Sequence, residues 1–212
     1  MKKLMLCLSI LSILSILSMF SLYAENIKVI ENKTISSIDI SDTLHIGYGS
    51  KISKVIMDTE NSTIKSIILE GTAFIQDYSF ISKCKNLETL VMNDIKIDNL
   101  SFLEKCKNLK ILSFDSVSFI KFPEINQMEN LEYLGITNCN LKDFSILTNH
   151  KDKLKYINLN NNKIVKLPRL RSNDKALYFV YGNNQISSKG KRIIATKNFM
   201  DKLPDEYKLY IR

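Results

Sequence analysis

The residues of this chain that could carry out catalysis or bind a metal are few and far apart. His45 and His150 are its two histidines, so neither an HExxH motif nor a cluster of imidazole ligands can form. Gly47 and Gly49 lack a third glycine in register and no GxxxxGK is present, so no nucleotide-binding loop is predicted. These patterns indicate a protein that is not an enzyme and that needs no cofactor or metal.

A Ser, His and carboxylate triad stays open as a distant alternative, because it needs only one histidine. We expect His45 in an N-terminal cap and His150 in a return segment, so that both are solvated and neither faces a binding surface. The carboxylates of Asp58 and Glu60 stand in a polar turn and are expected to face solvent rather than to hold calcium.

Cysteine usage gives no metal site. Cys7 lies in the apolar N-terminal run, which leaves the odd set of Cys84, Cys106 and Cys139 with no CxxC spacing. Cys84 and Cys106 occupy the same place in the similar stretches CKNLETL and CKNLKIL. A disulfide between them and a pair of buried thiols are both open. Parallel stacking would aim the two side chains the same way, which favours the thiols.

The element that must position every other residue is a repeated pattern. The stretch LKYINLNNNKI, from Leu154 to Ile164, reads LxxLxLxxNxI, and the template also fits elsewhere at steps of 22 or 23 residues. Its six starting points are Ile64, Leu87, Leu109, Leu131, Leu154 and Ala176. Such a step is typical of leucine-rich repeats, in which each unit is one short strand and a return segment. We therefore predict an α/β leucine-rich repeat solenoid with a parallel β-sheet on its concave face and short helices or extended returns on its convex face.

Residues inside each repeat give finer expectations. Asp77 and Asn99 stand two residues before a serine and should begin one or two helical turns, whereas Pro123 and Pro168 should keep their returns extended. In the first repeat the residues expected to point inward include Phe74.

The asparagine position of the template predicts a hydrogen-bonded ladder through the turns. Asn162 and Asn184 can bond the turn amides of their own and adjacent repeats, whereas Ile95 and Val117 cannot. We therefore expect the second and third repeats to be the least regular.

Four segments make up the chain. Residues 1–24 have two lysines, an apolar run and Ala24 before an acidic residue, which is the layout of a signal peptide; a retained N-terminal membrane anchor is the alternative. Residues 25–63 are expected to form an N-terminal cap of short strands, residues 64–186 six leucine-rich repeats, and residues 187–212 a C-terminal cap. The protein is therefore expected to be secreted, periplasmic or on the cell surface.

The net charge of +8 falls to +6 once the two N-terminal lysines are removed. In an exported protein this charge points to acidic envelope polymers, anionic lipid or a protein partner rather than to nucleic acid. We favour the simpler explanation, a lysine-rich soluble surface without a specific anionic partner.

The six repeats resemble those of extracellular bacterial leucine-rich repeat proteins with short 22-residue units, the internalin-like class. The stretch NLSFLEKCKNLKIL also resembles the CxxL repeats found on the surfaces of oral and intestinal bacteria. The resemblance covers residues 64–186 and implies a protein-binding role, often toward host receptors. It implies no particular ligand, because the fixed residues are those that build the core.

Side chains alternate along a strand, so template positions 3, 5 and 7 should face outward on the concave sheet. Position 3 carries Tyr133, Tyr156 and Tyr178 on successive repeats, a rigid stripe of the kind enriched at binding hot spots. The predicted ligand-binding residues are Tyr133, Tyr156, Tyr178, Asn158, Asn160, Ile111 and Asp115. Alternatively, tyrosines in this column only stabilise the sheet across its strands.

The sequence thus predicts an exported, monomeric, non-catalytic module that captures a protein partner, host-derived or not, on its concave face. The alternative is a structural envelope protein that binds acidic polymers through a basic surface. Binding to a membrane is expected only if the signal segment is retained.

Overall fold

The structure, a computed structural model, describes residues 27–31, 34–38, 42–57, 63–123, 127–143, 154–166 and 178–186. The expected signal peptide, the C-terminal cap, and the residues His150, Pro168, Asp58 and Glu60 lie outside these ranges. Among the described residues, no helix is long and apolar enough to cross a bilayer.

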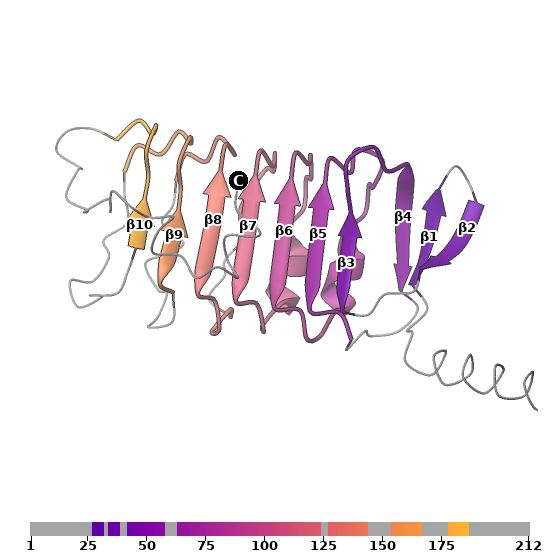
Figure 1. The fold of residues 1–212 in the computed structure, drawn as a ribbon. Helices are drawn as coiled ribbons and strands as arrows, with labels where there is room; N and C mark the ends of the chain where they lie inside the picture. Colours follow the sequence, from indigo (N-terminus) through magenta and orange to yellow (C-terminus); the bar gives the residue numbers. More distant parts are fainter. Residues whose placement is uncertain are drawn as a thin grey trace, which may run out of the picture.

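A seven-stranded parallel sheet runs the length of the molecule (Figure 1), in the order β10-β9-β8-β7-β6-β5-β3. Its strands are β3 (Thr43–Ile46), β5 (Ser66–Glu70), β6 (Thr89–Asn93), β7 (Ile111–Asp115), β8 (Tyr133–Thr137), β9 (Tyr156–Asn158) and β10 (Tyr178–Val180). Each strand from β5 to β10 begins at template position 3, so the repeat step becomes the strand register. The predicted leucine-rich repeat solenoid is confirmed.

The core lies on the side of the sheet that carries template positions 4 and 6. Leu112, Phe114, Leu134 and Ile136 are fully buried there, and they belong to one continuous cluster with the returns. Because stacked repeats place equivalent residues on neighbouring strands, the apolar side chains form continuous rows that exclude water.

One inward residue of the first repeat was wrongly predicted. Phe74 is 56% exposed, and the next residue, Ile75, is buried in the core in its place. The first repeat step is 23 residues long, against 22 for the second. The chain also turns at Gly71 with a positive φ of 58° before it reaches Ile75. The template therefore runs one residue out of phase after the first strand.

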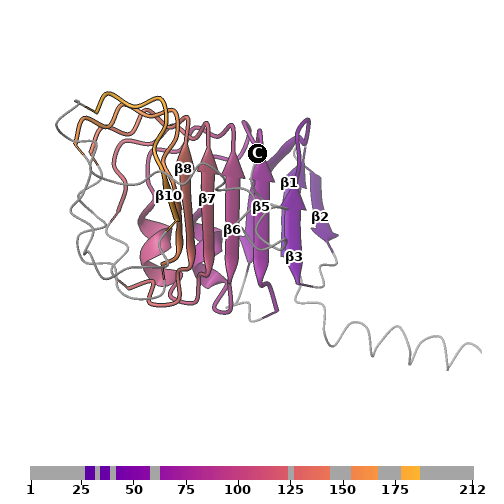
Figure 2. The same cartoon turned by 60° about the vertical axis from the view of Figure 1, so that its left-hand side comes forward.

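Two return segments carry 3-10 helices, η1 (Ser79–Lys83) and η2 (Ser101–Lys105), which lie behind the sheet in Figure 1. The Asp77 carboxylate accepts a hydrogen bond from the backbone N–H of Ser79 at 2.8 Å, and the Asn99 side-chain oxygen accepts the equivalent bond from Ser101 at 2.8 Å. The predicted helical turns are therefore confirmed in these two returns. Figure 2 shows the strands in front of them stacked side by side in chain order.

The N-terminal region forms short strands, but they belong to two sheets. β1 (Ile27–Glu31), β2 (Thr34–Ile38) and β4 (Ile52–Met57) form an antiparallel sheet in the order β2-β1-β4. The remaining strand, β3, instead pairs in parallel with β5 and extends the long sheet by one strand. The apolar spacing within β4 resembles that of a repeat, yet β4 pairs antiparallel with β1.

The asparagine ladder forms where asparagine is present. The Asn162 side-chain oxygen accepts from the backbone N–H groups of Cys139 and Leu141 at 3.1 and 3.0 Å. Asn184 does the same for Ile164 at 3.0 Å.

The expected irregularity of the second and third repeats is wrong. β6 and β7 have five residues each and pair in unbroken register. Main-chain bonds replace the missing asparagines, because Ser118 N–H donates to the Ile95 carbonyl and Ile97 N–H donates to the Ser118 carbonyl, each at 2.8 Å. The turns therefore remain satisfied without a side-chain amide.

Candidate binding face

The candidate site is the sheet face opposite the core, which we call the concave face. It consists of the outward residues of β3 and β5 to β10, together with those that immediately follow β9 and β10. Strand alternation arranges them in three columns that run across the strands, corresponding to template positions 3, 5 and 7. From β5 onward the columns carry Glu70 and Asp115 as charged residues and contain no lysine or arginine. The basic net charge of the chain is therefore located elsewhere.

Two of the predicted tyrosines form a stacked pair. Tyr156 and Tyr178 are directly opposite each other on β9 and β10. Their ring centroids are 5.3 Å apart and their planes differ by 9°. Both side chains are half-buried, so the pair offers a rigid aromatic surface with part of its area open to a partner.

Tyr133 aligns with Tyr156 but is buried, with 1% of its surface exposed. Its hydroxyl lies above Gly135, where an added Cβ would come within 2.7 Å of the phenolic oxygen. Burial raises the pKa of Tyr133 well above its usual value, although hydrogen bonds from Asn158 and Ser113 oppose that shift.

Ile111 and Asn158 are also buried, so the predicted stripe is not uniformly exposed. Ile111 and Tyr133 form a small apolar cluster against which Tyr156, Tyr178 and Val180 pack. Among the predicted site residues, Tyr156, Tyr178, Asn160 and Asp115 therefore retain partial exposure, while Tyr133, Ile111 and Asn158 lie beneath the surface.

A polar column runs along the carboxyl ends of the strands. Asp115 accepts hydrogen bonds from the Thr137 hydroxyl and the Asn138 amide, both at 2.6 Å. Asn160 accepts from the Gly182 backbone N–H at 2.6 Å. These bonds link neighbouring strands and fix the side chains in place, which limits the entropy lost when a partner binds.

The placement of His45 was wrongly predicted, since it lies on the concave face. Its strand, β3, pairs with β5 so that His45 stands opposite Ile68 in the position 5 column. The imidazole Nε2 lies 3.1 Å from the Glu70 carboxylate, which also accepts from the Asn93 amide at 3.3 Å. The sequence does contain a signal for this position of His45. Thr43 precedes Ser66 by 23 residues, which is the length of one repeat step.

The described residues give no support for metal or thiol chemistry. No group of three or more His, Cys, Asp or Glu side chains that could hold a metal is found among them. Cys84, Cys106 and Cys139 are free thiols buried in the core. Cys84 and Cys106 are therefore a pair of buried thiols and not a disulfide. Burial raises the pKa of Cys106 and of Cys139 to about 12, which keeps both thiols protonated and unreactive near neutral pH.

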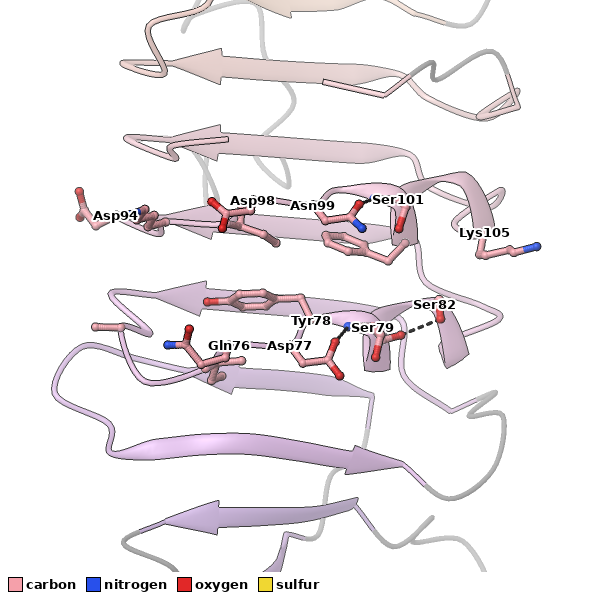
Figure 3. A pocket seen from close by; sticks show the side chains of 15 residues that line it. Gln76, Asp77, Tyr78, Ser79, Ser82, Asp94, Asp98, Asn99, Ser101 and Lys105 are labelled. Carbon is pink, nitrogen blue, oxygen red and sulfur yellow. Dashed lines mark hydrogen bonds between the residues drawn. The ribbon is translucent and has the colours of Figure 1, made fainter. Parts of the chain in front are cut away.

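A groove of about 730 Å³ lies on the convex side between the first two described returns (Figure 3). Its polar lining includes Asp77, Ser79, Asp98, Asn99 and Ser101. Asp77 and Asn99 already bond the backbones of η1 and η2. Hydrogen bonds from Ser79 hold the pKa of Asp77 below its usual value. Asp77 and Asn99 therefore help to build the returns.

Comparison with known proteins finds similar solved structures but no related sequence. No protein-family model matches the sequence, and no curated protein sequence matches it. An internalin C2 from Listeria monocytogenes is a similar solved structure, with 24% sequence identity, a TM-score of 0.48, and coverage of 59% of this chain and 55% of that one.

An internalin F from the same organism has 19% identity, a TM-score of 0.41, and coverage of 61% of this chain and 51% of that one. The match thus spans about half the length of each solved protein. Both are internalins, the class that the repeats resemble.

Proposed function

We propose that this leucine-rich repeat solenoid is an exported, non-catalytic module that captures a protein partner, with proteins of a host cell as the candidate class. The observation that supports it most is the stacked, half-exposed pair of Tyr156 and Tyr178, 5.3 Å apart on two strands of the concave face. Tyrosine adds a large contact area at low entropic cost when its ring is already held in place.

Other polar groups of the same sheet face suit a protein surface. Asn160 and Asp115 are partly exposed in the position 7 column and are already fixed by bonds to adjacent strands. An aromatic centre with a polar border is the usual anatomy of a protein interface. The tyrosine pair is then supported by the buried residues beneath the surface of this face, which are Tyr133, Ile111 and Asn158.

The second candidate, an envelope protein that binds acidic polymers, is supported by the basic net charge, which is +8 for the whole sequence and stays positive once Lys2 and Lys3 are removed. The concave columns from β5 onward offer such a polymer two carboxylates and no cationic side chain. Polymer binding would therefore use the lysine-rich returns and would weaken steeply with salt. The two functions thus use different faces of the molecule.

Site-specific photo-crosslinking on intact cells separates the two. A benzoylphenylalanine at Tyr178 tests the concave face, and one at Ile120, an 80% exposed return residue, is the matched control. Capture of one discrete protein from Tyr178 and not from Ile120 supports the proposal. Equal capture from both positions, or capture from Ile120 alone, would contradict it. Retention on a heparin column of the wild-type chain alone measures the polymer alternative.

A further inference from the structure

The groove on the convex side has walls made of equivalent residues from two consecutive repeats. Polar side chains form two rows along it (Figure 3), with Gln76, Asp77 and Ser79 on one side and Asp98, Asn99 and Ser101 on the other. Each residue of the first row stands 22 residues before its counterpart in the second row, which is one repeat step. A ligand that follows the groove therefore meets polar groups from both sides, in the same order.

Several of these side chains have atoms that the fold does not use. Asn99 bonds the Ser101 backbone through its side-chain oxygen, which leaves its Nδ2 as a donor. Within the described part of the chain, neither the Gln76 amide nor the Asp98 carboxylate makes a hydrogen bond, and both residues are exposed. The groove therefore presents two amides and a carboxylate that are available to a ligand.

The walls of the groove are held in place before any ligand arrives. Asp77 and Asn99 each accept a hydrogen bond at 2.8 Å from a backbone N–H, those of Ser79 and Ser101. The hydrogen bonds from Ser79 hold the pKa of Asp77 below its usual value, so its carboxylate stays charged at neutral pH. A ligand meets side chains that are already oriented, which limits the entropy lost on binding.

The lining of the groove is close to neutral although the chain is basic. Its charged side chains are Asp77, Asp94, Asp98, Lys96 and Lys105. The whole sequence, in contrast, carries a net charge of +8. A polyanion would meet three carboxylates here and a polycation would meet two lysines, so the groove favours a ligand without net charge.

The floor of the groove offers little to an apolar ligand. It consists of side chains that are buried in the core, namely Ile75, Tyr78, Ile97 and Phe102. Peptides that bind in grooves rely on open pockets for their side chains, and these four residues leave no such pocket. A sugar hydroxyl, in contrast, both donates and accepts hydrogen bonds, so it matches a lining of amide, carboxylate and hydroxyl groups.

We propose that this groove binds a short neutral oligosaccharide, whose hydroxyls bond the Gln76 amide, the Asp98 carboxylate and the Asn99 Nδ2. The cavity of about 730 Å³ is within the size range of small-molecule sites. The groove and the concave face lie on opposite sides of the solenoid, so the inference goes beyond the proposed function and does not depend on it. A bacterial envelope and a host glycoprotein can both supply such a sugar, because the hydroxyl chemistry is the same.

Binding of the full-length chain to an array of neutral oligosaccharides tests the proposal. The array carries bacterial envelope sugars and host glycoprotein sugars, so it also separates the two sources. Titration calorimetry then measures the affinity for the sugar that is bound most tightly. This affinity should change little between low and high salt, because the ligand has no charge.

The double variant Gln76→Ala and Asp98→Ala should lose about tenfold or more in affinity for that sugar, because a hydrogen bond to a charged group is removed. Its thermal melt should stay unchanged, since neither side chain bonds the described part of the fold. Glu129→Ala removes an exposed carboxylate outside the groove and is the matched control, with wild-type affinity expected.

The double variant Tyr156→Ser and Tyr178→Ser separates this site from the concave face, and it should bind the sugar as the wild-type chain does. Loss of sugar binding in this tyrosine variant would place the sugar on the concave face and overturn the proposal. Wild-type affinity in the Gln76 and Asp98 variant would also overturn it. The same holds if the chain binds no neutral sugar, or binds only acidic glycans or arrayed peptides.

Discussion

Tyr133 and Gly135 occupy one site on β8: the phenolic hydroxyl of Tyr133 lies where the side chain of residue 135 would begin. A Cβ on Gly135 would stand 2.7 Å from that oxygen and 2.9 Å from a ring carbon. Glycine is therefore required here by space, and the tyrosine can lie against the sheet only because the next outward position is empty.

Replacing Gly135 with alanine should destabilise the fold by about 1 to 3 kcal/mol, because a buried ring must move out of an already packed position. Urea unfolding followed by circular dichroism measures this change. Gly47→Ala is the matched control, since its Cβ would meet His45 at an ordinary 3.6 Å. Equal stability of the two variants would mean that Tyr133 does not lie over Gly135.

Asn162→Ala should cost about 2 to 4 kcal/mol, because two buried backbone N–H groups, those of Cys139 and Leu141, lose their acceptor. The free energy of unfolding in urea reports the loss. Asn184→Ala is the comparison, and its cost should be smaller because Asn184 is half-exposed and water can replace it. A cost for Asn184→Ala that matched or exceeded that of Asn162→Ala would contradict the ladder.

Alkaline pH should reduce stability through the buried thiols. Below pH 9 the thiols of Cys106 and Cys139 are protonated in both the folded and the unfolded chain. Between the ordinary pKa of 9.0 and the folded pKa of about 12, only the unfolded chain loses these protons. Stability therefore falls with rising pH, by about 1.4 kcal/mol per pH unit for each thiol.

The measurement is the pH dependence of the urea midpoint between pH 8 and pH 11. The double variant Cys106→Ala and Cys139→Ala should show a shallower decline than the wild-type chain. The two proteins differ only at Cys106 and Cys139, so the difference in slope isolates these two thiols. An unchanged slope would show that the thiols are not buried in the folded state.

The sequence predicted the solenoid because its signal is repeated. Leu112 and Leu134 recur at the same template position, and the register pairs them directly on β7 and β8. Any stacked arrangement that buries both must align the residues between them. The columns of the concave face, and the alignment of Tyr133 with Tyr156, follow from that alignment alone.

What the sequence missed lies where one repeat departs from the others. The template predicts an inward Phe74 because it does not include the extra residue of the first repeat step. It does not identify His45 as part of the sheet, because in β3 only Leu44 and Ile46 match the template, at positions 4 and 6. Two apolar residues are too few to distinguish a strand of the repeat sheet from an isolated strand.

Exposure could not be predicted from the repeat pattern either. The template states which way Tyr133 points, but it does not state what covers the ring. Similarly, the absence of asparagine at Ile95 and Val117 suggested irregular turns, whereas the main chain of Ser118 supplies the bonds. Both differences concern partners outside the pattern, which pattern reasoning alone does not identify.

The most direct test of the central claim, that the concave face binds a protein, uses the double variant Tyr156→Ser and Tyr178→Ser. Its affinity for the protein captured in the crosslinking experiment would be measured at low and high salt, with Ile120→Ser as the control. The account predicts a loss of about thirtyfold or more in affinity for the double variant, with a cooperative melt retained and little dependence on salt. Wild-type affinity in the double variant, together with binding that salt abolishes, would contradict it.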